Sequence, residues 1–118
     1  MIGVDLVDIE RLRRVLERSP GLENRVFSGR ERSYCRSKSD PVRHFAGTLA
    51  AKEAVIKAAR LGALGAWARR IEITREASGA PVVSLDGEIA PISASISHDG
   101  GMAVAAAMML PAGDHSSR

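Results

Sequence analysis

Aromatic residues are scarce in this chain. Phenylalanine, tryptophan and tyrosine together make up 3% of its 118 residues, so the core must be built from Ala, Val, Ile, Leu and Met. Few rings are available to stack on nucleic-acid bases, and no nucleic-acid-binding motif is present. We therefore expect no nucleic-acid partner. A small basic nucleic-acid-binding domain stays as an alternative, which salt-dependent binding to arbitrary DNA would favour.

Cysteine and long apolar runs are also nearly absent. The single Cys35 cannot form a disulfide within the chain, which is typical of a reducing compartment and predicts a cytoplasmic protein. The longest strongly apolar run, residues 102–110, is too short to cross a bilayer. Asp5 and Asp8 interrupt the N-terminus where a signal peptide would need an apolar segment. We expect no membrane partner.

The remaining composition predicts one compact domain. Hydrophobic residues make up 45% of the chain and charged residues 26%, which is ordinary for a globular protein. We expect the domain to cover residues 1–110 and to be followed by a polar, disordered tail, residues 111–118. A domain of this size buries only a modest core, so association into an oligomer would be unsurprising.

Positive charge is in excess, with a formal net charge of +3, and this favours anionic partners. The basic residues cluster early in the chain. On a predicted helix over residues 10–19, Arg11, Arg14 and Arg18 share one face, and the apolar residues share the opposite face. Taken alone, the arginine face could be an interaction surface or simply a solvated one.

Hydrophobic periodicity and turn residues predict both helices and strands. We expect strands over residues 1–9, 71–76, 82–85, 93–98 and 102–110. We expect helices over residues 10–19, 28–35 and 41–61. The second helix begins with a capping box of Ser28 and Glu31. The third begins with Asp40 as N-cap and Pro41 at the first helical position, and stops at Gly62.

The long predicted helix carries charge on an apolar background. Glu53 and Lys57 lie about one turn apart on one face, while the rest of the helix is apolar nearly all round and should be buried. Charged groups there need partners. The simplest interpretation is an i,i+4 ion pair worth about 0.2–0.5 kcal/mol.

Two further polar residues lie in predicted strands. Asp5 points away from Val4 and Leu6, and a carboxylate in a short apolar strand is costly unless it is paired or binds a metal. A capping or ion-pair role at the strand end is the alternative. His98 ends a strand next to a glycine-rich turn, where a lone histidine is more often structural than catalytic.

In combination these pieces resemble the holo-acyl-carrier-protein synthase type of 4′-phosphopantetheinyl transferase. GVDLVDIERL is similar to the family's N-terminal G-[IV]-D-[IV]-x-x-[IV]-x-R strand–helix. LAAKEAVIKA is similar to its helix motif F-A-A-K-E-A-x-x-K-A, and SISHDGGMAVA to its closing S-[IL]-S-H strand pair. SGAPVVSL fits the hairpin between them. The pieces occur in the family's order over residues 1–110.

The resemblance implies an α+β fold, with a small antiparallel sheet packed on a long central helix, and a homotrimer with active sites between subunits. It implies transfer of the phosphopantetheine arm of coenzyme A to a serine of an apo acyl carrier protein, releasing adenosine 3′,5′-bisphosphate. Asp5 and Glu53 would bind Mg²⁺, or Mn²⁺ in its place, because hard cations prefer oxygen ligands. Lys57 would stabilise charge on the leaving oxygen, and His98 would lie near the coenzyme A phosphates. Glu53, Lys57 and His98 are thus the candidate catalytic residues.

Other residues receive roles from the same resemblance. Gly62 and Gly65 fall where the family has a glycine-rich loop whose backbone N–H groups could approach a phosphate, although Gly62 could equally be a simple helix cap. Arg11 aligns with the family's carrier-contacting arginine, and Arg14 and Arg18 would extend that contact. The base that removes the serine proton could be Glu53 or a metal-bound water.

Two departures from the family pattern stand out. Thr48 replaces a residue that is usually basic, which puts nucleotide-phosphate binding there in question. The segment LDGEIAPISA is too short for a helix that usually precedes S-x-S-H. The resemblance implies a carrier of fatty-acid or polyketide synthesis, and these departures add the alternative of a specialised transferase that serves a secondary-metabolism carrier domain. A further alternative is a catalytically weak or inactive homologue that acts as a complex subunit.

Overall fold

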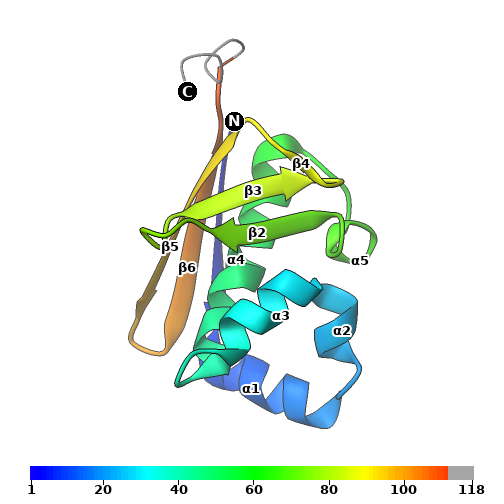
Figure 1. Ribbon diagram of the computed structural model, residues 1–118, viewed down its shortest axis with the longest axis vertical. Coiled ribbons are helices and arrows are strands. Elements are labelled where there is room, and N and C mark those ends of the chain that lie inside the picture. Colours follow the sequence, from blue (N-terminus) through cyan, green and yellow to red (C-terminus); the bar gives the residue numbers. More distant parts are fainter. Residues whose placement is uncertain (112–118) are drawn as a thin grey trace.

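A computed structural model describes residues 1–111, which form two three-stranded antiparallel sheets around a long helix (Figure 1). The first sheet has the order β1-β6-β5 and comprises β1 (Ile2–Asp8), β5 (Ile92–Asp99) and β6 (Met102–Met109). The second has the order β2-β3-β4 and comprises β2 (Ile71–Arg75), β3 (Pro81–Leu85) and β4 (Glu88–Ile89). The helices are α1 (Ile9–Arg18), α2 (Leu22–Val26), α3 (Gly29–Arg36), α4 (Pro41–Ala59) and α5 (Leu64–Trp67).

This architecture confirms the α+β prediction, with additions. A second sheet accompanies the expected one, and three short elements, α2, α5 and β4, were not predicted. Elements of two to five residues have too little periodicity to be recognised from sequence. The expected tail begins beyond β6, and its residues 112–118 lie outside the described part of the chain.

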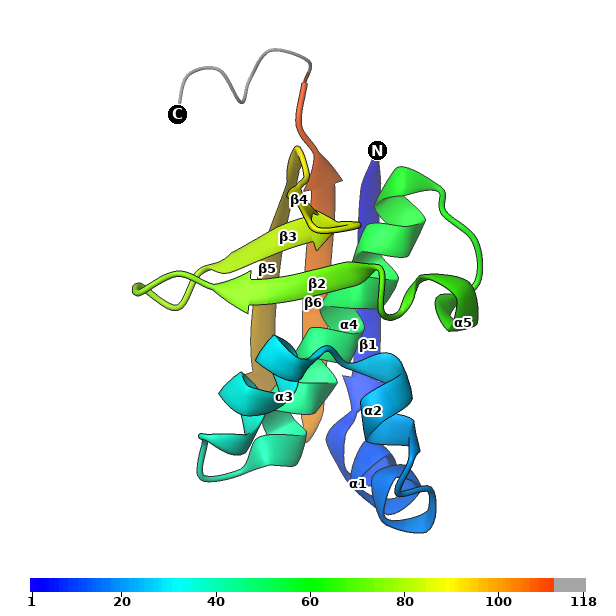
Figure 2. The same cartoon turned by 45° about the vertical axis from the view of Figure 1, so that its right-hand side comes forward.

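Helix α4 is the centre of the molecule, as its apolar surface predicted. One side packs on β1, β6 and β5, and the other is covered by the second sheet and by α3 (Figure 2). Alanine dominates the contact: Ala50, Ala51, Ala54 and Ala58 are all essentially inaccessible to solvent. Small side chains let the helix lie close to the sheet, and this closeness positions the polar residues described below.

Strand β1 approaches α4 most closely at Gly3. A Cβ atom added there would lie 2.1 Å from the backbone oxygen of Ala54 and 2.7 Å from the backbone nitrogen of Ala58. Only a residue without a side chain fits at this point. Because side chains alternate along a strand, Asp5 faces α4 on the same side as Gly3, while Val4 and Leu6 face outward.

The two ends of α4 only partly follow the prediction. Asp40 is the N-cap residue and Pro41 occupies the first turn, as expected, but the Asp40 carboxylate bonds to the Arg13 guanidinium at 3.1 and 3.2 Å instead of capping the helix. The predicted stop at Gly62 is wrong. The helix ends at Ala59, and Arg60 follows in the left-handed conformation with φ 56° and ψ 44°.

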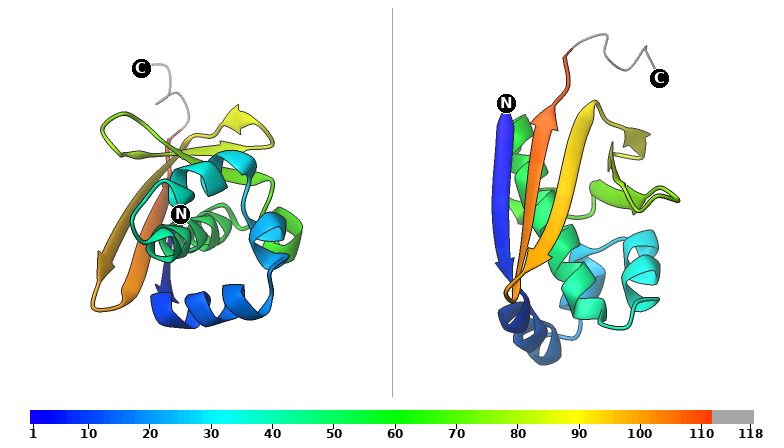
Figure 3. Two further views of the ribbon diagram at one scale, coloured as in Figure 1. Left: turned by 60° about the horizontal axis from the view of Figure 1, so that its bottom comes forward. Right: turned by 90° about the vertical axis from the view of Figure 1, so that its left-hand side faces the viewer.

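The outer face of the first sheet, which is apolar on β1 and β6 and carries serines on β5, is not covered by any element of residues 1–111 (Figure 3, right). Ile2, Val4, Leu6 and Met108 are between 47% and 67% exposed on it. A contiguous exposed apolar face of this kind is typical of an interaction surface. Separately, no helix in the described part of the chain is both long and apolar enough to cross a membrane.

Candidate functional site

A cavity of about 590 Å³ opens between β1, α1, α2, α4 and α5. Most of its wall is apolar. Within residues 1–111, four charged residues line it: Asp5, Asp8, Arg11 and Glu53. Asp8 is accounted for locally, because its Oδ1 accepts a hydrogen bond from the backbone N–H of Arg11 at 3.0 Å and caps α1. The other three have no such local capping role.

Asp5 is paired with a lysine from α4. Lys57 Nζ lies 2.8 Å from Asp5 Oδ1 and donates a second hydrogen bond to the backbone oxygen of Val4 at 3.1 Å. The bond to Asp5 raises the pKa of Lys57, so its ammonium stays charged. Asp5 thus takes the place of Glu53 in the ion pair that sequence spacing suggested.

Glu53 lines the same cavity without an ion-pair partner among residues 1–111. Burial raises the pKa of its carboxyl group, and the nearby negative charge of Asp5 raises it further. A cation bound beside Glu53 would stabilise the ionised form of this carboxyl group, which burial and the charge of Asp5 disfavour. Glu53 and Asp5 therefore converge on one cavity, as the predicted metal site requires.

The donor set fits magnesium better than a transition metal. In the described part of the chain, no group of three or more His, Cys, Asp or Glu residues is arranged to hold a metal ion. Asp5 and Glu53 would supply only two carboxylates. Mg²⁺ is usually bound in this way, through one or two carboxylates, with water and substrate phosphates completing its shell.

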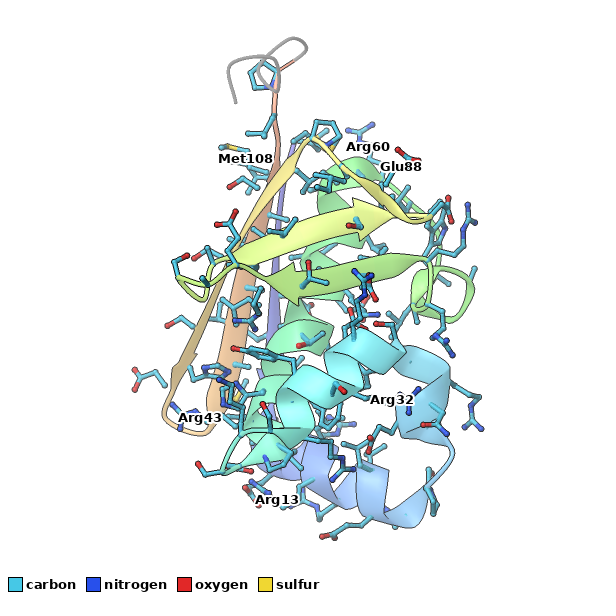
Figure 4. All side chains as sticks on the ribbon, in the orientation of Figure 1. Arg13, Arg32, Arg43, Arg60, Glu88 and Met108 are labelled. Carbon is cyan, nitrogen blue, oxygen red and sulfur yellow. The ribbon has the colours of Figure 1, made fainter. Side chains whose placement is uncertain are left out.

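His98, on β5, packs against a different part of α4. Its Nε2 is 3.0 Å from the backbone oxygen of Arg43 (labelled in Figure 4), and its ring centroid is 5.8 Å from that of His44. A Cβ added to Gly47 would meet His98 Nε2 at 2.9 Å, so the histidine packs on the first half of the helix. A single chain therefore does not bring His98 to Asp5 and Glu53.

The two predicted loop glycines lie just beyond α4. Gly62 packs near the Trp67 ring, and Gly65 falls within the short helix α5 with no other atom close to its Cβ position. The alternative role of Gly62 as helix cap is wrong, because Arg60 occupies the cap. Leu64, between them, lines the cavity, so this segment does form part of its wall. Phosphate binding by the two glycines stays a prediction.

The arginine face of α1 lies next to the cavity. Arg11, Arg14 and Arg18 are all exposed, while Ile9 and Leu12 on the opposite side are buried. Arg11 also lines the cavity itself. The structure therefore joins the basic face to the pair of carboxylates.

Thr48 has no access to a ligand. It is 2% exposed, and its hydroxyl donates a hydrogen bond to the backbone oxygen of His44 at 2.9 Å. Its Oγ1 also lies 3.8 Å from Cys35 Sγ. A phosphate of coenzyme A is therefore not bound by this residue in the folded chain, and an arginine at the position would be buried.

Sequence reasoning missed a buried ion pair beside the site. Lys52, immediately before Glu53, and Glu31 of α3 are both inaccessible, with Nζ and Oε1 2.8 Å apart. Lys52 also donates to the backbone oxygens of Val26, Ala68 and Ile71. One ammonium thus ties α4 to four other segments. Its placement between alanines on an otherwise apolar helix was the available signal.

The apolar wall of the cavity was also missed. It is formed by residues far apart in sequence: Val15, Leu16, Leu22, Val26, Phe27, Leu49 and Leu64. Most of them belong to the apolar faces of their own helices, and only the arrangement of those helices leaves a cavity between them. Periodicity predicts which faces of the helices are apolar, but it does not predict that a cavity remains between these faces.

Comparison with known proteins gives consistent matches. Residues 1–108 match the 4′-phosphopantetheinyl transferase superfamily. The chain is 41% identical over 117 residues to a holo-[acyl-carrier-protein] synthase of Desulforudis audaxviator, covering 91% of this chain and 89% of that one.

Solved structures agree in fold. The chain is similar to Helicobacter pylori holo-[acyl-carrier-protein] synthase in complex with coenzyme A, with a TM-score of 0.78 and 32% identity over 92% of this chain and 98% of that one. It is also similar to a Chronobacterium ammoniagenes ACPS–CoA complex, with a TM-score of 0.74 and 33% identity over 90% and 92% of the two chains.

Proposed function

Because this chain belongs to the 4′-phosphopantetheinyl transferase superfamily, we propose that it carries out Mg²⁺-dependent transfer of the phosphopantetheine arm of coenzyme A to an acyl carrier protein. The acceptor is a serine hydroxyl of the apo carrier, and adenosine 3′,5′-bisphosphate is released. One observation carries this proposal: Asp5 and Glu53, from separate elements, line one cavity, and Lys57 is bonded to Asp5.

The two carboxylates would hold the cation. When bound, Mg²⁺, or Mn²⁺ in its place, neutralises charge on the diphosphate of coenzyme A and so makes attack by a hydroxyl easier. Asp5 is fixed by β1, and Glu53 by the buried helix α4. Both ligands therefore come from rigid elements held together by the close packing at Gly3.

Lys57 serves the leaving group. In the reaction the serine oxygen forms a bond to the phosphorus, and the bond from that phosphorus to the bridging oxygen breaks. The electron pair remains with the bisphosphate, where the Lys57 ammonium can stabilise the developing charge. Glu53 is one candidate to take the serine proton, since its carboxylate lines the cavity in which the reaction would take place.

We further propose a homotrimer, which would complete the site. His98 is distant from Asp5 and Glu53 within one chain, so it reaches a coenzyme A phosphate only if it belongs to another copy. The exposed apolar face of Ile2, Val4, Leu6 and Met108 supports such an association. Sedimentation of the purified protein as a monomer at micromolar concentration would exclude this arrangement.

The carrier would dock on α1. Acyl carrier proteins present acidic helices, and Arg11, Arg14 and Arg18 offer an exposed basic face beside the cavity. Carriers of fatty-acid or polyketide synthesis both fit this chemistry. A charge reversal at Arg14 that left the KM for the carrier unchanged would argue against this contact.

The proposed compartment is the cytoplasm. The only cysteine, Cys35, is free and buried, and burial raises the pKa of its thiol to about 11. A buried thiol with a raised pKa reacts slowly, and a single free cysteine fits a reducing compartment.

A second candidate function has one observation in its favour. Thr48 stands where relatives usually have a basic residue, and it is buried, so one expected phosphate contact is missing. A catalytically weak or inactive homologue acting as a complex subunit would tolerate this loss. The intact set of Asp5, Glu53, Lys57 and His98 favours the enzyme.

The direct test is incubation with coenzyme A, Mg²⁺ and an apo carrier protein, read by the intact mass of the carrier. We expect a gain of one phosphopantetheine arm with Mg²⁺ or Mn²⁺, and none after the metal is removed with EDTA, because the diphosphate charge is then not neutralised. A known transferase run in parallel controls for the carrier's competence. No gain with several competent carriers would exclude the enzyme and leave the subunit role.

A further inference from the structure

The C-terminal end of α4 carries an unusual backbone conformation at Arg60. The N–H of Leu61 reaches back to the oxygen of Ile56 at 2.9 Å, and Arg60 turns the chain with φ 56° and ψ 44°. Glycine is the usual residue at such a turn, because a side chain meets its own backbone there. An arginine is therefore kept at a position that disfavours it, and strain of this kind suggests a function for the side chain.

Arg60 extends the exposed stripe that carries the candidate site. Along α4, Glu53, Lys57 and Arg60 follow the spacing i, i+4, i+7, which repeats on one side of a helix. From Ala50 to Ala58, Glu53 and Lys57 are the only residues that are not buried. The stripe is thus the one solvent-accessible side of this half of the helix, and Arg60 stands at its end, with its side chain in solvent (Figure 4).

Arg60 is also the basic residue of the stripe that makes no ion pair within residues 1–111. The Lys57 ammonium is already occupied by Asp5 and by the backbone oxygen of Val4. By contrast, no carboxylate within residues 1–111 lies within ion-pairing distance of the Arg60 guanidinium. Its five N–H donors have no assigned role in holding the fold.

We infer that Arg60 is a further cosubstrate-binding residue, whose guanidinium grips the diphosphate of coenzyme A one turn beyond Lys57. The inference rests on the proposed function. A planar guanidinium can donate two parallel hydrogen bonds to phosphate oxygens, which a single ammonium does not. The left-handed backbone at Arg60 sets the direction of this side chain along the stripe. This conformation therefore lowers the stability of the fold while it improves the affinity for the ligand.

The test compares equilibrium binding with thermal stability in the same variants. Affinities for coenzyme A and for dephospho-coenzyme A are measured by isothermal titration calorimetry with Mg²⁺ present, and Tm by scanning calorimetry. We expect Arg60→Gly to weaken both ligands alike, by about tenfold, because both contain the diphosphate. The same variant should raise Tm by about 3 °C, since glycine adopts this conformation without strain.

Two matched variants control the result. Arg60→Lys keeps the charge and the strained backbone but loses the two parallel hydrogen bonds, so it should weaken both ligands by about threefold, between the wild type and Arg60→Gly. Asp86→Gly relieves the other left-handed non-glycine residue, φ 50°, which lies in the β3–β4 turn away from the site. It should leave both affinities unchanged.

The affinities of the Arg60→Gly variant decide whether Arg60 contacts the diphosphate. If Arg60→Gly binds both ligands as tightly as the wild type, or if the loss is confined to coenzyme A, the diphosphate contact is excluded; the second pattern would assign the residue to the 3′-phosphate. If Tm rises and affinity is unchanged, the strain has no binding role. A wild-type protein that binds neither ligand overturns the proposed function, and this inference with it.

Discussion

Replacing Glu53 by glutamine, or Asp5 by asparagine, should reduce phosphopantetheine transfer by about a thousandfold or more. Among residues 1–111, two carboxylates line the cavity without a local capping role, and each change removes one of them while keeping the size and shape of the side chain. A lost metal ligand in a two-carboxylate site removes several kcal/mol of transition-state stabilisation, and about 4 kcal/mol corresponds to a thousandfold in rate. The measurement is the initial rate of carrier mass gain at saturating coenzyme A and Mg²⁺.

The stability of the folded protein should change little on replacing Glu53 by glutamine, and any change should be an increase. Burial raises the pKa of Glu53 in the folded protein, so the folded state binds more protons than the unfolded state in the range above the ordinary carboxyl pKa. Stability therefore falls as pH rises through that range, and the loss remains at neutral pH. Glu53→Gln removes this loss, so we expect a Tm at pH 7 no lower than that of the wild type.

The matched control is Glu88→Gln. Glu88 is exposed on β4 (Figure 4) and makes no ion pair within the described residues, so the same chemical change there should leave both rate and Tm unchanged. A Glu53→Gln enzyme that turned over within about twofold of the wild type, together with normal turnover in Asp5→Asn, would refute the metal assignment.

Replacing Gly3 by alanine should destabilise the protein severely, although it adds only one methyl group. The new Cβ would lie 2.1 Å from the oxygen of Ala54, 2.7 Å from the nitrogen of Ala58 and 2.9 Å from Lys57 Cβ. Two of these are backbone atoms of a buried helix, which do not rotate away. We expect a loss of about 4 kcal/mol or more in the free energy of unfolding, or failure to fold.

The control for this change is Gly65→Ala. Gly65 lies in α5 with no atom within 4 Å of its Cβ position, and its backbone is not in the left-handed region. Alanine there should be neutral or slightly stabilising. Urea denaturation followed by circular dichroism measures both variants. A Gly3→Ala protein within about 1 kcal/mol of the wild type would show that β1 does not pack on α4 as closely as described.

Gly3 and the candidate metal site are linked through β1. The same strand that needs glycine at position 3 carries Asp5 two residues later, on the same face. A residue that pushed β1 away from α4 would also separate Asp5 from Lys57 and Glu53. A partly folded Gly3→Ala variant should therefore lose transfer activity even under conditions where its secondary structure survives.

Local rules determined much of this protein from its sequence. Alternation along β1 predicted that Asp5 faces opposite to Val4 and Leu6, and the burial of the strand agrees. The capping box of Ser28 and Glu31 is formed as expected. Gly100 and Gly101, both at positive φ, make the turn between β5 and β6. These features depend on interactions within a few residues, so the sequence contains all the information they need.

Tertiary structure alone decided which charged groups meet. Helical spacing paired Lys57 with Glu53, but β1 brings Asp5 to within 2.8 Å of the lysine and takes its place. Lysine side chains are usually exposed, yet Lys52 is buried and is surrounded by Glu31 and three backbone oxygens. A partner from a distant element changes neither spacing nor composition, and therefore leaves no periodic signal in the sequence.

The same physical reason applies to the residues whose surroundings differ from expectation. Thr48 lies on the long helix where the family resemblance predicts a basic residue, but packing against α3 buries it beside Cys35. His98 was predicted to end its strand and lies one residue before the end of β5 at Asp99, where the strand sets it against the first half of α4. Sequence periodicity fixes the face on which a side chain lies, and only the packing of whole elements fixes what that face meets.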